Sequence, residues 1–139
     1  MSELFGADEI NPENMRIRDE WVLALKEFMD QVKLWIDEAQ LDQALQVQEH
    51  SLEKNEEYIG SYTAPALTIL APSCNIEVLP VGRFAIGPIG RVDVTNHQLS
   101  YTLLFSSKKG WASLDQRKPL TKSLFLELVQ KMINRTEVQ

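Results

Sequence analysis

The sequence predicts an α+β fold in which a long N-terminal amphipathic helix and a C-terminal helix cover one face of an antiparallel sheet. Three observations lead to this prediction. Apolar residues recur at helical spacing over 21–39, short strand-like runs separated by Pro, Gly, Asn or Ser occupy 45–111, and helical spacing returns after Pro119. Short connections between strands favour an antiparallel β-meander, and an amphipathic helix needs an apolar face to cover.

The first helix is expected to begin at Asn11 and to end near Gln40. Asn11 is a suitable N-cap, and Pro12 is favoured at the first helical position. We expect residues 1–13 to form a flexible N-terminal segment and residues 14–139 a single α+β domain. Two tryptophans on one helix face would also suit anchors for a partner, but the following sheet needs a cover, so this face is expected to pack inward. It contains Trp21, Val22, Leu25, Phe28, Met29, Val32, Trp35, Ile36 and Ala39.

Helical spacing gives way to alternation after the first helix. Residues 45–50 alternate between apolar and polar positions, which predicts a strand, followed by a turn over 54–57 and a return strand over 58–63. The segment is polar, and a helical continuation over 41–52 is the alternative. The sequence therefore leaves strand and helix both open for residues 43–55.

Further strands are expected over 67–70, 76–81, 84–86, 91–95 and 99–105. Residues 107–110 have the composition of a hairpin turn, with Gly110 in the left-handed position, and lead into a short strand around Trp111. The last helix is expected to hold Pro119 in an early position. Its inward face contains Leu120, Leu124, Phe125, Leu128, Val129, Lys131, Met132 and Ile133.

Charge and cysteine content argue against several functional classes. Fourteen basic residues against 20 acidic ones give a net charge of −6, which repels phosphate backbones, so no nucleic acid partner is expected. The N-terminus is acidic and no window approaches about 18 uninterrupted apolar residues, so neither a signal peptide nor a membrane span is expected. Cys74 is the single cysteine and cannot form an internal disulfide. We therefore expect a cytoplasmic location.

The segment 76–94 combines glycine and proline with strand-forming residues. Gly82 and Gly87 have the spacing of a Walker A loop, but the next two residues are not the lysine and hydroxyl residue that phosphate and magnesium binding require. Gly90 precedes a β-branched run and does not open a helix, which argues against a dinucleotide loop. We expect a structural bend in which Gly87 or Gly90 takes a conformation that is costly for other residues.

The candidate recognition residues are Arg83, Arg91, Asp93 and Trp111. Arg91 and Asp93 stand two residues apart on one face of a strand, which predicts an exposed ion pair. The alternative is that Arg83 and Arg91 converge across the bend to bind a carboxylate or phosphate in fork geometry.

No residue pattern predicts a catalytic group, a cofactor or a bound metal. His50 and His97 are the only histidines, and neither has ligand spacing with the other or with Cys74. His97 follows Asn96 and suits a polar turn. The spacing of Cys74 and His97 gives no support to a nucleophile and base pair.

Two functions from different classes follow. The favoured one is a non-enzymatic cytosolic protein-interaction module of immunity, adaptor or chaperone type, because a compact acidic domain without reactive clusters needs only a shaped surface to act. The alternative is a small-ligand-binding or enzymatic domain centred on Arg83, Arg91 and Asp93. A ligand site requires a concave pocket with converging polar groups, whereas an interaction module should expose an apolar or acidic patch or a free sheet edge.

Overall fold

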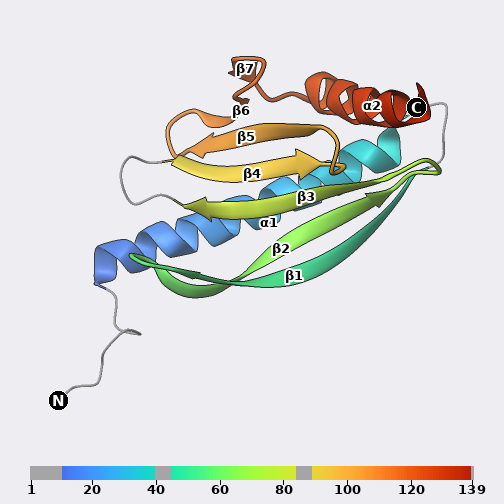
Figure 1. Cartoon of the computed structure of the whole chain (residues 1–139). Helices are drawn as coiled ribbons and strands as arrows, with labels where there is room; N and C mark the ends of the chain where they lie inside the picture. Colours follow the sequence, from blue (N-terminus) through green and yellow to red (C-terminus); the bar gives the residue numbers. More distant parts are fainter. Residues whose placement is uncertain (1–10, 40–44, 84–88, 139) are drawn as a thin grey trace.

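A computed structural model of the chain describes residues 11–39, 45–83 and 89–138 (Figure 1). The elements are α1 (Pro12–Glu38), β1 (Gln46–Glu56), β2 (Gly60–Leu70), β3 (Asn75–Arg83), β4 (Ile89–Thr95), β5 (Ser100–Ser106), β6 (Gly110–Ser113), β7 (Lys118–Pro119) and α2 (Lys122–Val138). The strands lie in the sheet in sequence order, and each neighbouring pair is antiparallel. The predicted α+β class and antiparallel meander are therefore confirmed.

Helix α1 is capped as the sequence predicts. The side chain of Asn11 accepts a hydrogen bond from the backbone N–H of Asn14 at 2.7 Å, and Pro12 occupies the first turn. The last two residues of the expected N-terminal segment, 12–13, are thus already helical. The buried residues of α1 are Trp21, Ala24, Leu25, Phe28, Met29, Val32 and Ile36. Val22, Trp35 and Ala39 are only half-buried, so the predicted apolar face packs inward except at these positions.

The β1–β2 hairpin shows that residues 46–56 form a strand, so the helical alternative is wrong over 46–52, and its first part, 41–44, lies outside the described residues. The turn lies at 57–59, three residues later than the sequence predicts, because Gly60 supplies the left-handed conformation with φ 79°. Strand β2 also runs through Pro65 to Leu70, where the sequence predicts a break. Pro65 stands opposite Ser51 within an unbroken register.

Strands β2 and β3 separate along their length. They pair only from Leu67 opposite Val78 to Leu70 opposite Asn75, although β2 begins at Gly60 and β3 continues to Arg83. Figure 1 shows the β1–β2 hairpin splaying away from β3 at one end of the sheet. The open edge of β3 must therefore find other hydrogen-bond partners.

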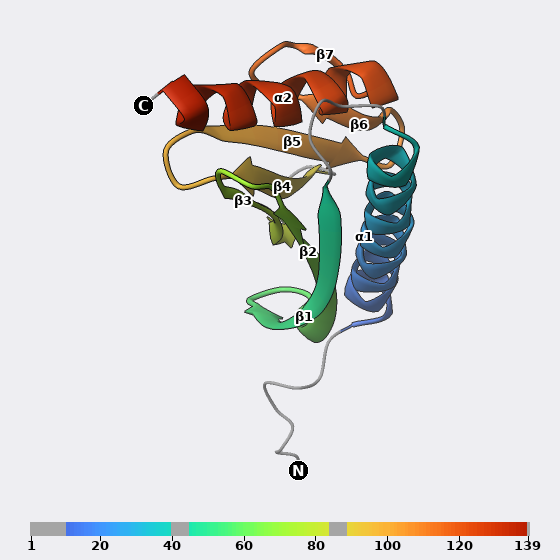
Figure 2. The same cartoon turned by 90° about the vertical axis from the view of Figure 1, so that its right-hand side faces the viewer.

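Both helices contribute to one hydrophobic core against the sheet (Figure 2). Val78, Val94 and Tyr101 are cross-strand partners on β3, β4 and β5, and all three are buried toward this core. The buried residues of α2 are Leu124, Phe125, Leu128, Val129, Met132 and Ile133. In the described chain, neither helix is long and apolar enough to cross a bilayer.

The start of α2 differs from the prediction. Pro119 lies in β7 opposite Ala112, and the N–H of Leu120 donates to the carbonyl of Trp111 at 3.0 Å, so the chain stays extended. The hydroxyl of Thr121 then accepts from the N–H of Leu124 at 3.1 Å and caps the helix. Lys131, predicted on the inward face, is exposed and pairs with a glutamate one turn earlier.

Gly90 is required for close packing and not for a left-handed conformation. A Cβ atom at this position would lie 2.4 Å from Cζ3 of Trp21, whereas the described glycines with positive φ are Gly60 and Gly110. The predicted backbone cost at Gly90 is therefore wrong, and the predicted left-handed Gly110 is confirmed with φ 77°. Gly87 and the expected strand over 84–86 lie outside the described residues.

Candidate functional site

A cleft of about 580 Å³ lies between α1 and the β5–β6 hairpin, and we call it the α1–β6 cleft. Buried and half-buried side chains form its floor, namely Ala24, Phe28, Trp35, Phe105, Trp111 and Leu120. Exposed side chains form its rim, namely Glu20, Leu23, Glu27, Gln31, Lys109 and Pro119. The cleft thus combines an aromatic floor with a mixed rim.

The floor is held in place by contacts between aromatic rings. Trp111 stacks on Phe28 with ring centroids 4.4 Å apart, and its cross-strand partner Phe105 lies 5.2 Å away. Trp21 lies beneath both rings, 6.0 Å from Trp111 and 6.1 Å from Phe105. Each such pair contributes about 0.5–1.5 kcal/mol beyond its buried area. The floor is therefore an extension of the core that stays partly open to solvent.

The rim carries charges of both signs. Oε1 of Glu20 accepts a hydrogen bond from the hydroxyl of Ser107 at 3.0 Å, which ties α1 to the turn between β5 and β6. Glu27 and Lys109 have no ion pair within the part of the chain that the structure describes. These two side chains are available to an occupant of the cleft.

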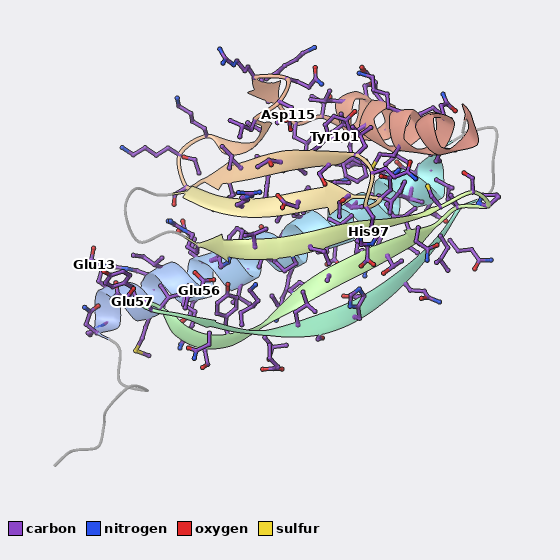
Figure 3. The ribbon with its side chains drawn as sticks, in the orientation of Figure 1. Glu13, Glu56, Glu57, His97, Tyr101 and Asp115 are labelled. Atoms are coloured by element: carbon purple, nitrogen blue, oxygen red, sulfur yellow. The ribbon has the colours of Figure 1, made fainter. Side chains whose placement is uncertain are left out.

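A buried chain of polar groups lies next to the cleft, in the gap between β2 and β3. Trp21 Nε1 donates to the hydroxyl of Tyr62 at 3.1 Å, and this hydroxyl donates to Glu56. The other carboxylate oxygen of Glu56, placed at the end of β1 (Figure 3), accepts from the N–H of Arg83 at 2.9 Å. Burial, together with the hydrogen bond to Glu56, raises the pKa of Tyr62. This set of hydrogen bonds satisfies the N–H of Arg83 on the open edge of β3 and links it to α1 and to the β1–β2 hairpin.

Arg83 and Arg91 lie on opposite faces of the sheet, so the predicted convergence is wrong. A bulge between Pro80 and Gly82 shifts the register of β3 by one residue and turns Arg83 to the side of Gly90 and α1. Arg83 is 5% exposed, and its Nη2 lies 4.0 Å from Glu20. Burial lowers the pKa of Arg83, and the nearby carboxylates oppose that change. Arg83 therefore lies near the rim residue Glu20 but does not line the cleft.

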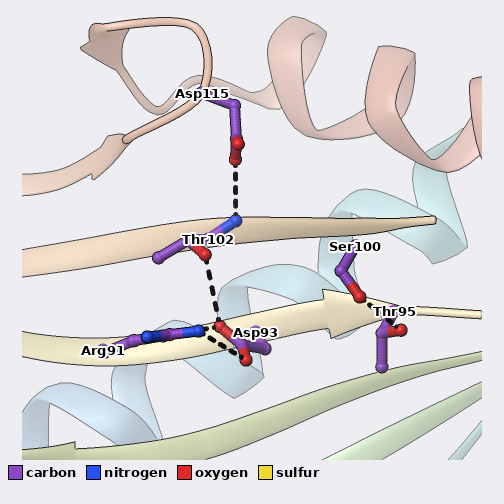
Figure 4. A network of polar contacts seen from close by, with 6 residues as sticks. All are labelled: Arg91, Asp93, Thr95, Ser100, Thr102 and Asp115. Carbon is purple, nitrogen blue, oxygen red and sulfur yellow. Dashed lines mark hydrogen bonds and ion pairs between the residues drawn. The ribbon is translucent and has the colours of Figure 1, made fainter. Parts of the chain in front are cut away.

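Arg91 and Asp93 form the predicted ion pair on the sheet face away from the helices (Figure 4). Arg91 Nε lies 2.9 Å from Oδ1 of Asp93, and Nη2 lies 3.1 Å from Oδ2. This hydrogen bonding raises the pKa of Arg91. Thr102 stands beside the pair, and its backbone N–H donates to Asp115 at 2.8 Å. Each oxygen of Asp93 accepts a hydrogen bond from Arg91, so the two charges bind each other and do not need a ligand.

Neither histidine makes a hydrogen bond to Cys74 within the part of the chain that the structure describes. His50 Nε2 lies 3.3 Å from the hydroxyl of Thr68, and His97 occupies a turn with φ 75°. Cys74 is half-buried between β2 and β3. Over residues 11–39, 45–83 and 89–138, no three His, Cys, Asp or Glu side chains gather in a way that could hold a metal ion.

Trp111 alone among the four predicted recognition residues lines the cleft. Sequence reasoning assigns Phe28 and Trp35 to the core and treats Phe105 only as the end of a strand. One usable signal is Leu23, an apolar residue among the polar positions of α1 that is 55% exposed in the structure. Because Leu23 lies beside the predicted apolar face, its exposure indicates that this edge of the face is not covered by the rest of the protein.

Comparison of the chain with protein-family models, with curated proteins and with solved structures gives no match. The geometry of the cleft and its surroundings is thus the basis for assigning a function.

Proposed function

We propose that this chain is a non-enzymatic protein-interaction module that binds a segment of a partner protein in the α1–β6 cleft. The observation that carries the proposal is the length of the aromatic-lined cleft along α1. The residues of α1 that line the cleft extend from Glu20 to Trp35, which corresponds to about 22 Å of helix. A groove of this length suits an extended or helical segment better than a compact metabolite.

The chemistry of the rim supports a protein partner. Leu23 is 55% exposed beside the aromatic floor, and so it adds apolar surface that water contacts in the free chain. One of the polar rim groups, Glu20, is already bonded to Ser107, which leaves fewer polar groups to bind a small ligand. A small-ligand site would need several polar groups directed at one ligand.

The cellular setting belongs to the same proposal. The single cysteine is half-buried and forms no disulfide, which is typical of proteins in a reducing compartment, so we place the module in the cytoplasm. Immunity proteins, adaptors and chaperones all act by presenting a shaped surface of this kind.

Leu23→Glu is expected to abolish binding of the partner, because it puts a charge on the apolar margin of the cleft. Leu34→Glu is the matched control, since Leu34 is also on α1 and is 49% exposed, but does not line the cleft. The measurement is quantitative affinity capture from cells that natively contain the chain, with the parent and both variants as bait.

The proposal requires a protein that the parent and Leu34→Glu retain and Leu23→Glu loses. If the three baits retain the same proteins in the same amounts, the cleft is not the interaction site.

A further inference from the structure

A second hollow lies beside β6 and β7, and we call it the β6–β7 hollow. It has a volume of about 380 Å³ and shares Lys109, Trp111 and Pro119 with the α1–β6 cleft. Its apolar lining includes Leu104, Ala112, Leu114 and Pro119, and its charged lining consists of Lys109, Arg117 and Lys118. Leu114 is 52% exposed, so apolar surface is open to solvent here.

The three cations of the hollow have no partner of their own. Their side chains make no ion pair or hydrogen bond within the described chain, and no acidic residue lines the hollow. Among the other described basic residues, some pair with a carboxylate, namely Arg18, Lys33, Arg91, Lys122 and Lys131. Others are exposed without an ion pair but lie outside the hollow, namely Arg16, Lys26 and Lys108. In a chain of net charge −6, the hollow is therefore a local concentration of uncompensated positive charge.

The turn between β6 and β7 fixes the backbone at two of these cations, Arg117 and Lys118. The N–H of Arg117 donates to the carbonyl of Ser113 at 2.9 Å, and the N–H of Gln116 donates to the hydroxyl of Ser113 at 3.2 Å. Arg117 has φ 58°, which is uncommon for a residue other than glycine, and Lys118 pairs with Ser113 in the ladder. The turn is a defined structure, so a complementary partner meets a preformed charge pattern.

We propose that the β6–β7 hollow binds an acidic segment of a partner protein in which carboxylates flank one apolar side chain. This goes beyond the function proposed for the α1–β6 cleft. The apolar side chain enters the hollow against Leu104 and Leu114, and the carboxylates meet Arg117 and Lys118 at its margin. A phosphate backbone is charged, so it would not make favourable contacts with the apolar part of this lining. A concave surface likewise accepts a side chain, whereas insertion into a bilayer needs a protruding one.

The test uses a labelled peptide with one apolar residue, acetyl-Asp-Glu-Leu-Glu-Asp-amide, and its charge-inverted form, acetyl-Lys-Lys-Leu-Lys-Lys-amide, with fluorescence anisotropy as readout. The acidic peptide should bind the full chain saturably, and the double variant Arg117→Glu, Lys118→Glu should weaken binding by about tenfold or more. The matched control is Arg16→Glu, Lys26→Glu. It makes the same charge change at exposed residues outside the hollow and should alter binding by less than about threefold.

Two further measurements distinguish the contribution of the charges from that of the apolar lining. The basic peptide should bind the Arg117→Glu, Lys118→Glu variant better than the parent, and Leu114→Gln should weaken the acidic peptide without changing net charge. Leu23→Glu should leave acidic-peptide binding unchanged, so failure here is distinguishable from failure of the α1–β6 cleft. Thermal unfolding checks that each variant is folded, and Lys118→Glu alone serves if the double variant is not.

The proposal is overturned if the acidic peptide does not bind, or if both charge variants weaken it equally. It is also overturned if the parent binds duplex DNA or anionic vesicles more tightly than the acidic peptide and loses that binding in Arg117→Glu, Lys118→Glu. The hollow would then be a phosphate site and not a protein site.

Discussion

Gly90→Val is expected to lower the free energy of unfolding by about 3 kcal/mol. The reason is steric, because a Cβ at Gly90 would lie 2.4 Å from one ring atom of Trp21 and 2.7 Å from two others. Trp21 is fully buried and donates a hydrogen bond to Tyr62, so its ring cannot move aside without losing that contact. Urea unfolding followed by circular dichroism measures the loss.

Two controls identify the cause. Arg91→Ala, at the next residue, should change stability by no more than about 1 kcal/mol, because its ion pair with Asp93 lies on the outer sheet face and is only half-buried. In a Trp21→Leu background, the same Gly90→Val change should cost clearly less, since the ring that it meets is gone. Equal costs in the two backgrounds would show that contact with Trp21 does not explain the glycine.

Phe28→Ala is expected to cost about 3–5 kcal/mol, enough to threaten a domain of ordinary stability. Phe28 is 4% exposed, stacks on Trp111 and makes an edge contact with Phe125, so its removal leaves a cavity between α1, β6 and α2. Leu34→Ala, on the exposed side of α1, should change stability by less than about 0.5 kcal/mol. Chemical denaturation of both variants against the parent gives the comparison.

Overlapping unfolding curves for Phe28→Ala and the parent would mean that this face of α1 is not part of the core. The aromatic rings would then belong to a binding surface alone, and the floor of the α1–β6 cleft would not be held by the fold.

Much of the fold could be predicted because its signals are local. The spacing of Trp21, Leu25, Phe28 and Val32 defines the helix face, Asn11 defines its start, and Gly110 defines a hairpin turn. Each of these depends on residues within a few positions of one another. The sequence places the start of α2 too early. Pro119 suits the first turn of a helix as well as an edge strand, and only its pairing with β6 decides between them.

The candidate site is harder to predict from the sequence because it depends on contacts between residues far apart in the chain. Alternation along β3 would place Arg83 on the same face as Asp93, and the bulge before Gly82 reverses that orientation. The contact of Phe28 with Trp111 joins residues far apart in the chain. Neither the bulge nor that contact has a local sequence signal, so composition could suggest an interaction module but not where it binds.

The central claim is that the α1–β6 cleft receives a protein partner, and site-specific photocrosslinking tests it most directly. A benzophenone side chain replaces Leu23 in one variant and Leu34 in another, and both are irradiated in cells that natively contain the chain. The account predicts one discrete protein adduct from position 23 and none from position 34. The same adduct from both positions, or an adduct from position 34 alone, would contradict it.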